Sequence, residues 1–511
     1  MIALTKRLCS LLPVLLLACS EAPLEPADGG RDAAPGADAS LPDTAAPDAA
    51  EVEDATLPVQ QNCTPCHAAQ AQRLAKGAHA KVQNQCLECH KDALAHQQNP
   101  AVRASIEFSL SSCGSCHGAY ASDFLKDDQS KPGKYGGSIK TSKYLDFPKY
   151  QHLMGGHGFT IEYNEERAHA WALKDHVDIK RKQNTVCLQC KSTPVTYYWN
   201  EQRRGMKLFT KDMTWSDAVF DIGVIAPTTA DHGTTCNHCH DPHSGDFRLI
   251  RKAMLASVME RGTDPYDAAR NFVPKTELEL SAKLNERGQD GKRTAESLRL
   301  AGILTCAQCH VEYTCGPGVD KTVLRDDFPW RKLRDIEDYY RVKYNTVQDW
   351  THTGTGLKGI KIQHPETEFF WESPHYKRGA TCASCHLAKS GATHSHWFTS
   401  PLKQPNATCG NCHNDVADRV AAVAVVQDDV MNKAKVVENT LDAVLTFIEA
   451  NPGYDAQKLA AAKQAFMRGL LWWEFTVVSE NSAGFHNPTE ANLNLDTALT
   501  EANNAKTLLG L

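Results

Sequence analysis

Short cysteine motifs punctuate the 511-residue chain from residue 63 onward. Each has two cysteines separated by two residues, and in seven of the eight a histidine follows directly. Two thiols at this spacing can form thioether bonds with one haem, and the histidine can then bind the iron. The sequence therefore predicts haem c at seven complete motifs: Cys63, Cys66 and His67; Cys86, Cys89 and His90; Cys113, Cys116 and His117; Cys236, Cys239 and His240; Cys306, Cys309 and His310; Cys382, Cys385 and His386; Cys409, Cys412 and His413.

The eighth motif, CLQCK, contains Cys187 and Cys190 but places Lys191 where the histidine should stand. A haem iron with two histidine ligands has no open position and can only pass electrons, whereas an enzyme must leave one axial position for its substrate. An amine ligand from Lys191 with no distal ligand would make this haem the catalytic one. The alternative is an electron-transfer haem whose ligand has changed.

Two other uses of paired cysteines fit this pattern less well. Zinc sites need cysteines and histidines that close a tetrahedron, and most of these motifs stand far from the next. Redox-active disulfides give no reason for the trailing histidine. The chain's 22 histidines also leave enough side chains, beyond the seven in the motifs, to give each low-spin haem a distal ligand.

The N-terminus resembles an export signal. Lys6 and Arg7 precede a short apolar run, and Cys19 ends a sequence that resembles the lipobox of bacterial lipoproteins. A cleaved signal with a chance cysteine is the alternative. Residues 20–58 are rich in Ala, Pro and Asp and predict a disordered tether. We expect a lipid-anchored protein on the periplasmic side of a bacterial envelope, where haem c is attached.

Composition and periodicity predict the remaining organisation. A formal net charge of -6 without basic runs gives no indication of nucleic-acid binding. Helices and loops with almost no sheet are expected around so many haems, and apolar residues at helical spacing predict long helices after His413. The predicted parts are a signal (1–19), a linker (20–58), a trihaem domain (59–135), a pentahaem catalytic domain (136–413) and a C-terminal helix bundle (414–511).

The five motifs from residue 187 to 413, with Lys191 in the first, resemble the pentahaem cytochrome c nitrite reductases. RAHAWAL (167–173), HVEY (310–313), KIQHPE (361–366) and GFHNP (484–488) are similar to stretches of that family. The three additional N-terminal motifs resemble its octahaem branch. The resemblance implies eight haems c and six-electron reduction of nitrite to ammonium at the Lys191 haem. It also implies electrons from a periplasmic or membrane donor, and a homo-oligomer is expected.

The resemblance implies a catalytic pocket above the Lys191 haem. Arg181 would bind the anionic substrate, and Tyr313 and His364 would complete the distal side. A cation and proton donors suit an anion whose N–O bonds must be cleaved. Arg181 lies nearer to the CLQCK motif than the family pattern has it, so Arg167 is the reserve. The octahaem branch also implies a thioether between Tyr313 and Cys315.

A calcium site is implied by the same resemblance. Its ligands would be Glu312, Gln363 and the backbone carbonyls of Tyr313 and Lys361, which are the oxygen donors that a hard cation prefers. A loop held only by hydrogen bonds is the alternative.

Distal histidines complete the assignment. The resemblance implies His169 for the haem of His310, His396 for that of His240, His486 for that of His386, and His375 for that of His413. For the three N-terminal haems, spacing alone suggests His79, His96 and His232, with His152, His157 and His243 in reserve.

Two other functions remain open at this stage. A multihaem conduit would store and pass electrons without catalysis. A reductase of this type could also act on sulfite, hydroxylamine, tetrathionate or another small nitrogen or sulfur oxyanion.

Overall fold

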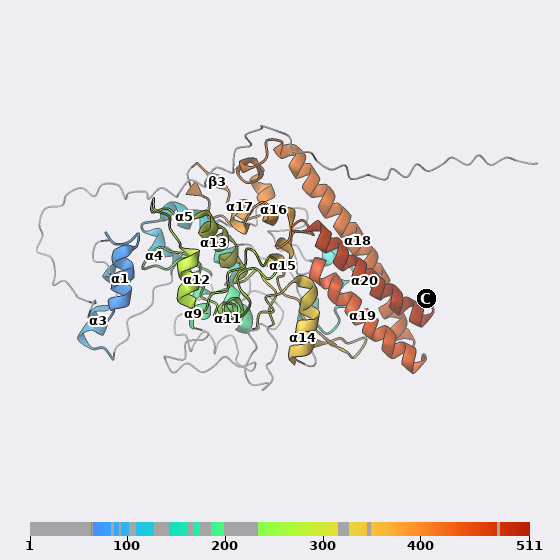
Figure 1. Cartoon of the computed structure of the whole chain (residues 1–511). Helices are drawn as coiled ribbons and strands as arrows, with labels where there is room; N and C mark the ends of the chain where they lie inside the picture. Colours follow the sequence, from blue (N-terminus) through green and yellow to red (C-terminus); the bar gives the residue numbers. More distant parts are fainter. Residues whose placement is uncertain are drawn as a thin grey trace, which may run out of the picture. The chain divides into compact units, whose positions relative to one another are not determined.

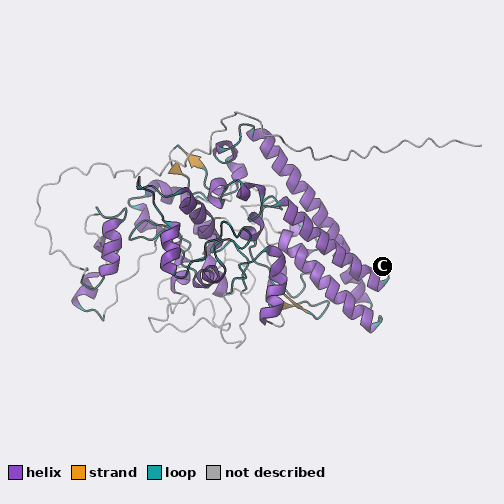
Figure 2. Ribbon diagram, viewed as in Figure 1, coloured by secondary structure: helices purple, strands orange, loops and turns teal. Residues whose placement is uncertain are grey.

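Helices and loops make up the computed structural model, and strands are few (Figure 2). All the described residues belong to one compact unit, Ala39–Leu511. The predicted mainly α fold with little β structure is confirmed. The predicted signal and linker lie outside the described residues, and the predicted domain boundaries stay predictions. The structure describes residues 63, 65–82, 86–90, 93–101, 109–126, 143–161, 168–173, 185–198, 233–314, 327–344, 349–391, 393–477 and 481–511.

Three long helices follow the last cysteine motif and pack on one another (Figure 1). They are α18 (Val416–Ala450), α19 (Ala456–Val477) and α20 (Pro488–Leu509). Buried side chains recur every three or four residues along α18, as an amphipathic helix requires. Pro452 and Gly453 separate α18 from α19, where the sequence predicted a break. The side chain of Asn487 caps α20, and Gly510 ends it in the left-handed conformation.

A large apolar core joins these helices to segments far away in the sequence. Trp473 of α19 is fully buried, its ring packs edge-on against Phe147 at 5.3 Å, and its indole N–H donates to the carbonyl of Ala434 on α18 at 3.0 Å. Trp350 of the hairpin β1 (Trp350–Thr351) and β2 (Lys358–Gly359) belongs to the same core. This core holds the 349–371 segment against the bundle.

A second core forms around α11 (Lys252–Arg261), α12 (Glu277–Leu284) and α13 (Ala295–Ala307). Thr294 caps α13 by accepting from the backbone N–H of Ser297 at 3.1 Å. Tyr313 and Trp371 are buried in the same core. It therefore surrounds the segments on which the sequence placed the catalytic and cation-binding residues.

Short helices carry most of the cysteine motifs. None of the helices among the described residues has the length and apolar composition needed to cross a bilayer. The remaining elements are α1 (Ala68–Lys76), α2 (Cys86–Cys89), α3 (Ala93–Gln98), α4 (Leu110–Gly114), α5 (Gly118–Phe124), α6 (Lys143–Asp146), α7 (Tyr150–Leu153), η2 (Gly158–Thr160), η3 (His169–Trp171), η4 (Thr185–Cys190), α9 (Thr193–Tyr198), η7 (Cys236–His238), η8 (Leu333–Asp335), α14 (Ile336–Tyr344), α15 (Glu366–Phe370), α16 (Pro374–Lys377), α17 (Cys382–His386), β3 (Lys389–Ser390) paired with β4 (Thr393–His394), η9 (Pro401–Lys403), η10 (Pro405–Ala407) and η11 (Cys409–Asn411).

Replacing Trp473 by alanine should destabilise the bundle strongly. The change removes a buried aromatic side chain and leaves the carbonyl of Ala434 without its indole donor, so we expect a loss of about 3–5 kcal/mol in the free energy of unfolding. Urea unfolding followed by far-ultraviolet circular dichroism measures it. Val425→Ala on the exposed side of α18 is the control and should change stability by less than about 0.5 kcal/mol. Equal effects of the two changes would contradict this packing.

Candidate functional site

Cysteines from motifs far apart in sequence lie next to each other. The thiol of Cys190, in the motif with Lys191, is hydrogen-bonded to that of Cys309. Cofactors attached at contacting motifs would therefore be neighbours. Cysteines of different motifs that share a side-chain hydrogen bond include Cys63 with Cys86, Cys113 with Cys236, Cys190 with Cys309, and Cys306 with Cys382.

Histidine rings face each other in pairs at a characteristic distance. Two imidazoles that bind one iron from opposite sides have ring centres about 6 Å apart, because each metal–nitrogen bond is about 2 Å long and the nitrogen lies about 1 Å from the ring centre. This spacing fits haem as the group held between the rings. The pairs that combine a motif histidine with one outside any motif are His67 with His96 (6.0 Å), His79 with His117 (5.9 Å), His90 with His243 (6.5 Å), His169 with His310 (6.1 Å), His375 with His413 (6.4 Å), His386 with His486 (6.2 Å) and His310 with His364 (6.2 Å).

The structure brings each of the four histidines assigned by family resemblance near its expected partner. His169, His375 and His486 form ring pairs with His310, His413 and His386. His396 interacts electrostatically with His240, and its ring packs edge-on against Tyr120 at 4.8 Å.

Of the distal histidines that spacing suggested for the three N-terminal haems, two lie in ring pairs. His96 faces His67 and His79 faces His117, whereas His243, one of the reserve residues, faces His90. His232 lies outside the described residues.

The other two reserve histidines are engaged elsewhere. His152 has both ring nitrogens against carboxylates of α18, with Nδ1 2.7 Å from Asp442 and Nε2 3.0 Å from Glu449. His157 is buried between Phe159 and Trp350 and accepts from the backbone N–H of Phe159. These contacts favour structural roles for both rings.

Several ring-pair histidines have the Nδ1 atom occupied by a protein acceptor. His79 Nδ1 lies 2.7 Å from the carbonyl of Pro242, and His386 Nδ1 lies 3.0 Å from that of Thr399. His243 Nδ1 lies 3.2 Å from a carboxylate oxygen of Asp241. Such bonds fix the ring and leave Nε2 for a metal, which is the usual arrangement around metal-binding histidines.

One short loop, 241–245, connects the N-terminal motifs to the rest of the chain. Asp241 forms a 2.7 Å ion pair with Arg73 of α1, and the carbonyl of Ser244 accepts from the backbone N–H of Ala78. Gly77 packs so closely that an added Cβ would lie 2.4 Å from the Cα of Ser244. The loop thus contacts both His79 and His90 through Pro242 and His243.

Catalytic residues predicted from distant motifs converge near the CLQCK motif. Cys190 interacts electrostatically with Lys191, Arg251 and His364. The guanidinium of Arg251 lies over the ring of Tyr313, which is 3% exposed. Arg167, Arg181 and Cys315 lie outside the described residues. Sequence reasoning missed Arg251, since a lone arginine beside a helix start carries no motif.

Glu366 links His364 to a motif histidine. Its Oε1 atom lies 3.7 Å from Nδ1 of His364 and 3.7 Å from Nδ1 of His310. Burial by itself would raise the pKa of the Glu366 carboxyl, but the interactions with both histidines hold that pKa well below its usual range. The Glu366 carboxyl therefore lies between the two histidine rings as a negatively charged neighbour of both.

Buried carboxylates surround the predicted cation site. Glu312 is fully buried and accepts from the Tyr340 hydroxyl at 2.9 Å and from the backbone N–H of Gln363 at 2.7 Å. Burial raises the pKa of Glu312 to about 8 despite these bonds. Glu474 and Asp349 interact with the same group and with Lys361. A cation here would stabilise the ionised carboxylates, so the donor set fits calcium.

Carbonyl oxygens must complete any such site. Among the described residues, no group of three or more His, Cys, Asp or Glu side chains is placed to hold a metal ion by itself. The Lys361 ammonium has no lone pair for a cation, so this residue could contribute only its backbone carbonyl, and its Nζ atom donates to Oε1 of Gln363 at 2.6 Å.

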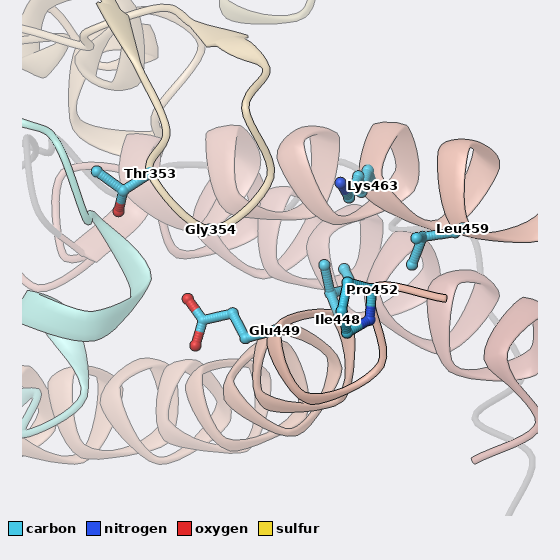
Figure 3. Close-up of a pocket in the computed structure, with 7 residues that line it drawn as sticks. All are labelled: Thr353, Gly354, Ile448, Glu449, Pro452, Leu459 and Lys463. Carbon is cyan, nitrogen blue, oxygen red and sulfur yellow. The ribbon is translucent and has the colours of Figure 1, made fainter. Parts of the chain in front are cut away.

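Two cavities differ in their relation to the motifs. One of about 710 Å³ lies between α4 and α5 beside the CGSCH motif, lined by small residues such as Gly114, Gly118 and Ala121, and suits a flat cofactor. The other, of about 380 Å³, has no motif residue in its lining and is assigned no part in the site (Figure 3). It is lined by Thr353, Gly354, Ile448, Glu449, Pro452, Leu459 and Lys463.

Comparisons with known proteins show which sequences this chain is similar to. The model of the family "Cytochrome c552" matches residues 119–511. The chain is 29% identical over 427 residues to the cytochrome c nitrite reductase subunit NrfA of Nitratidesulfovibrio vulgaris, covering 74% of this chain and 73% of that protein. It is 27% identical over 403 residues to cytochrome c-552 of Porphyromonas gingivalis, covering 74% and 71%.

A solved structure has a similar fold. The cytochrome c nitrite reductase of Desulfovibrio desulfuricans, whose catalytic subunit was described with two calcium sites, superposes with a TM-score of 0.64. The sequence identity is 23%, and the match covers 79% of this chain and 86% of that one.

Proposed function

This chain belongs to the cytochrome c552 family, and we propose that it is a cytochrome c nitrite reductase that forms ammonium at the Lys191 haem. The convergence of Cys190, Lys191, Tyr313 and His364, together with the relatives that reduce nitrite, is the observation that carries the proposal. Lys191 is the one motif residue in the proximal position that is not histidine.

Eight haems c would be held by the eight cysteine motifs, three of them in the N-terminal region. When bound, haem c supplies stores of single electrons and, at an open axial position, an iron that can bind a small anion. Each ring pair would supply two histidine ligands to one haem, so these haems would serve electron transfer alone. In the proposed assignment, Lys191 is the one protein ligand assigned to the haem of the CLQCK motif.

The pocket side chains would supply the protons that the reaction consumes. Nitrite, eight protons and six electrons give ammonium and two water molecules, so a proton donor must be re-supplied throughout the reaction. His364, which lies 3.7 Å from Glu366, would donate protons. Tyr313 is buried under Arg251 and would complete the pocket, and Arg181, with Arg167 in reserve, would bind the anion.

The distal ligands follow from the ring pairs. We assign His96 to the haem of His67, His243 to that of His90, and His79 to that of His117. His169, His396, His486 and His375 serve the haems of His310, His240, His386 and His413. His310 has two histidine neighbours, and His169 is chosen because His364 lies at the CLQCK motif.

Calcium is proposed at Glu312, Gln363 and the carbonyls of Tyr313 and Lys361. The same proposal includes a Tyr313–Cys315 thioether, a lipidated Cys19, a periplasmic location, an external electron donor and a homo-oligomer. Sulfite and hydroxylamine are proposed as further substrates, because the pocket would recognise a small oxyanion or amine by charge and size.

Replacing Lys191 by histidine should leave haem attachment intact and abolish most catalysis. The attachment cysteines remain, but the stronger imidazole ligand alters the one reactive iron, and we expect nitrite turnover to fall by more than about 100-fold. Haem content by pyridine haemochrome and steady-state ammonium formation measure the two effects. Lys252→Ala, which removes an exposed lysine paired with Glu277, should leave both unchanged. Full turnover in Lys191→His protein would refute the assignment.

Replacing His243 by alanine should open one of the N-terminal haems. The haem of His90 would lose its distal ligand, so electron paramagnetic resonance should show one additional high-spin centre. His152→Ala, at a histidine held by two carboxylates, should add none. An unchanged low-spin spectrum in the His243→Ala protein would exclude this residue as the ligand.

Chelation of calcium should lower both turnover and the midpoint temperature of unfolding. Removal of the cation would leave the negative charges of the buried Glu312 and its neighbours without a compensating positive charge. Adding Ca²⁺ back should restore activity, and Mg²⁺ should not, because it demands a tighter octahedral shell. Glu312→Gln protein should contain less calcium by elemental analysis, whereas Glu277→Gln at an exposed position should not. Bound calcium that persists in Glu312→Gln protein would contradict the site.

A further inference from the structure

A fully buried arginine lies beside the CLQCK motif. Arg251 immediately precedes α11 and has no solvent exposure. Its backbone is held by Gln308, whose side-chain oxygen accepts from the N–H of Ile250 at 2.6 Å. Burying a guanidinium is costly unless neighbouring groups stabilise the charge, so its contacts indicate what the residue does.

The guanidinium of Arg251 lies over two aromatic rings. Its central carbon is 4.6 Å from the ring centre of Tyr313 and 4.6 Å from that of Phe328. The two rings stack on each other with centres 5.8 Å apart. Cation–π attraction is strongest away from water, and all three side chains are buried. Arg251 therefore fixes the orientation of the Tyr313 ring.

The same guanidinium reaches the haem attachment motif. Nη1 of Arg251 donates to the carbonyl of Gln308 at 2.8 Å and lies 2.9 Å from the sulfur of Cys190. A thioether sulfur is still a weak acceptor, so haem attachment would not remove the acceptor of this contact. One side chain thus bridges the CLQCK motif, the CAQCH motif and the distal tyrosine.

We infer that Arg251 is a positioning residue of the Lys191 haem, which ties Tyr313 to Cys190 and keeps a permanent positive charge at the attachment edge. This inference rests on the proposed function in taking the Lys191 haem as the reactive one. A fixed positive charge stabilises the reduced, less positive state of a neighbouring haem. Arg251 should therefore raise the reduction potential of that haem and make it the acceptor of electrons from its neighbours.

Arg251→Gln is the direct test, because glutamine retains hydrogen-bonding capacity without the charge. The potential of the high-spin haem is read by titration with paramagnetic resonance detection, without nitrite. We expect the ratio of reduced to oxidised haem at a fixed applied potential to fall about tenfold, as for the loss of one buried charge nearby. Arg251→Lys keeps the charge and should restore most of this ratio.

Controls separate this role from a general loss of structure. Arg261, at the other end of α11, lies over the ring of Tyr339 at 5.3 Å, and Arg261→Gln should leave the potential unchanged. Haem content reports folding in every variant. If Arg251→Gln fails to assemble, an Arg251→Lys protein with full haem content and a wild-type potential supports the inference.

An unchanged reduction potential in Arg251→Gln protein with full haem content would overturn the inference. A reduction potential in Arg251→Lys protein as low as that expected for Arg251→Gln would also overturn it. Neither result depends on turnover. A failure of the proposed nitrite reduction would instead appear as the absence of ammonium formation by the wild-type protein, so the two failures are distinguishable.

Discussion

Opposed histidine rings about 6 Å apart are the constraint that organises this molecule. In the proposed assignment, the two imidazoles of a pair would bind one haem iron, and the partners come from separate parts of the sequence. His169 meets His310, and His386 meets His486. The segments that carry these histidines are short helices and loops. Their backbone would have to fit around the cofactors, which disfavours long regular elements. The two apolar cores lie beside these segments and hold them in place.

The 241–245 loop shows how the N-terminal motifs are integrated into the molecule. Asp241 binds Arg73, Pro242 accepts from His79, and His243 faces His90. This loop directly follows the CNHCH motif and supplies contacts to His79 and to His90 of the CLECH motif. In the proposed assignment, the haem of His90 is completed only when this loop is docked, so the N-terminal motifs and the rest of the chain are assembled together.

Local pattern predicted much of the architecture. The cysteine motifs, the long helices after residue 413 and the scarcity of strands follow from short-range spacing, and the mainly α fold is confirmed. Long-range partnership was harder to derive. Spacing suggested His232 and kept His243 only in reserve, whereas the structure places His243 opposite His90. Docking of the 241–245 loop depends on contacts with Arg73, Gly77 and Ala78 that no periodicity reveals. Arg251 likewise belongs to no sequence motif, and its role can be inferred only from its burial between Tyr313 and Cys190.

The central claim is the proposal that the haem at Lys191 keeps an open axial position, whereas each motif histidine has another histidine nearby, in a ring pair or, for His240, through its electrostatic interaction with His396. Quantitative low-temperature electron paramagnetic resonance of the oxidised wild-type protein, with haem content determined on the same sample, tests this most directly. We predict eight haems per chain, one high-spin centre, and loss of its signal when nitrite is added. A spectrum with only low-spin haems, or a high-spin signal that nitrite leaves unchanged, would contradict the account.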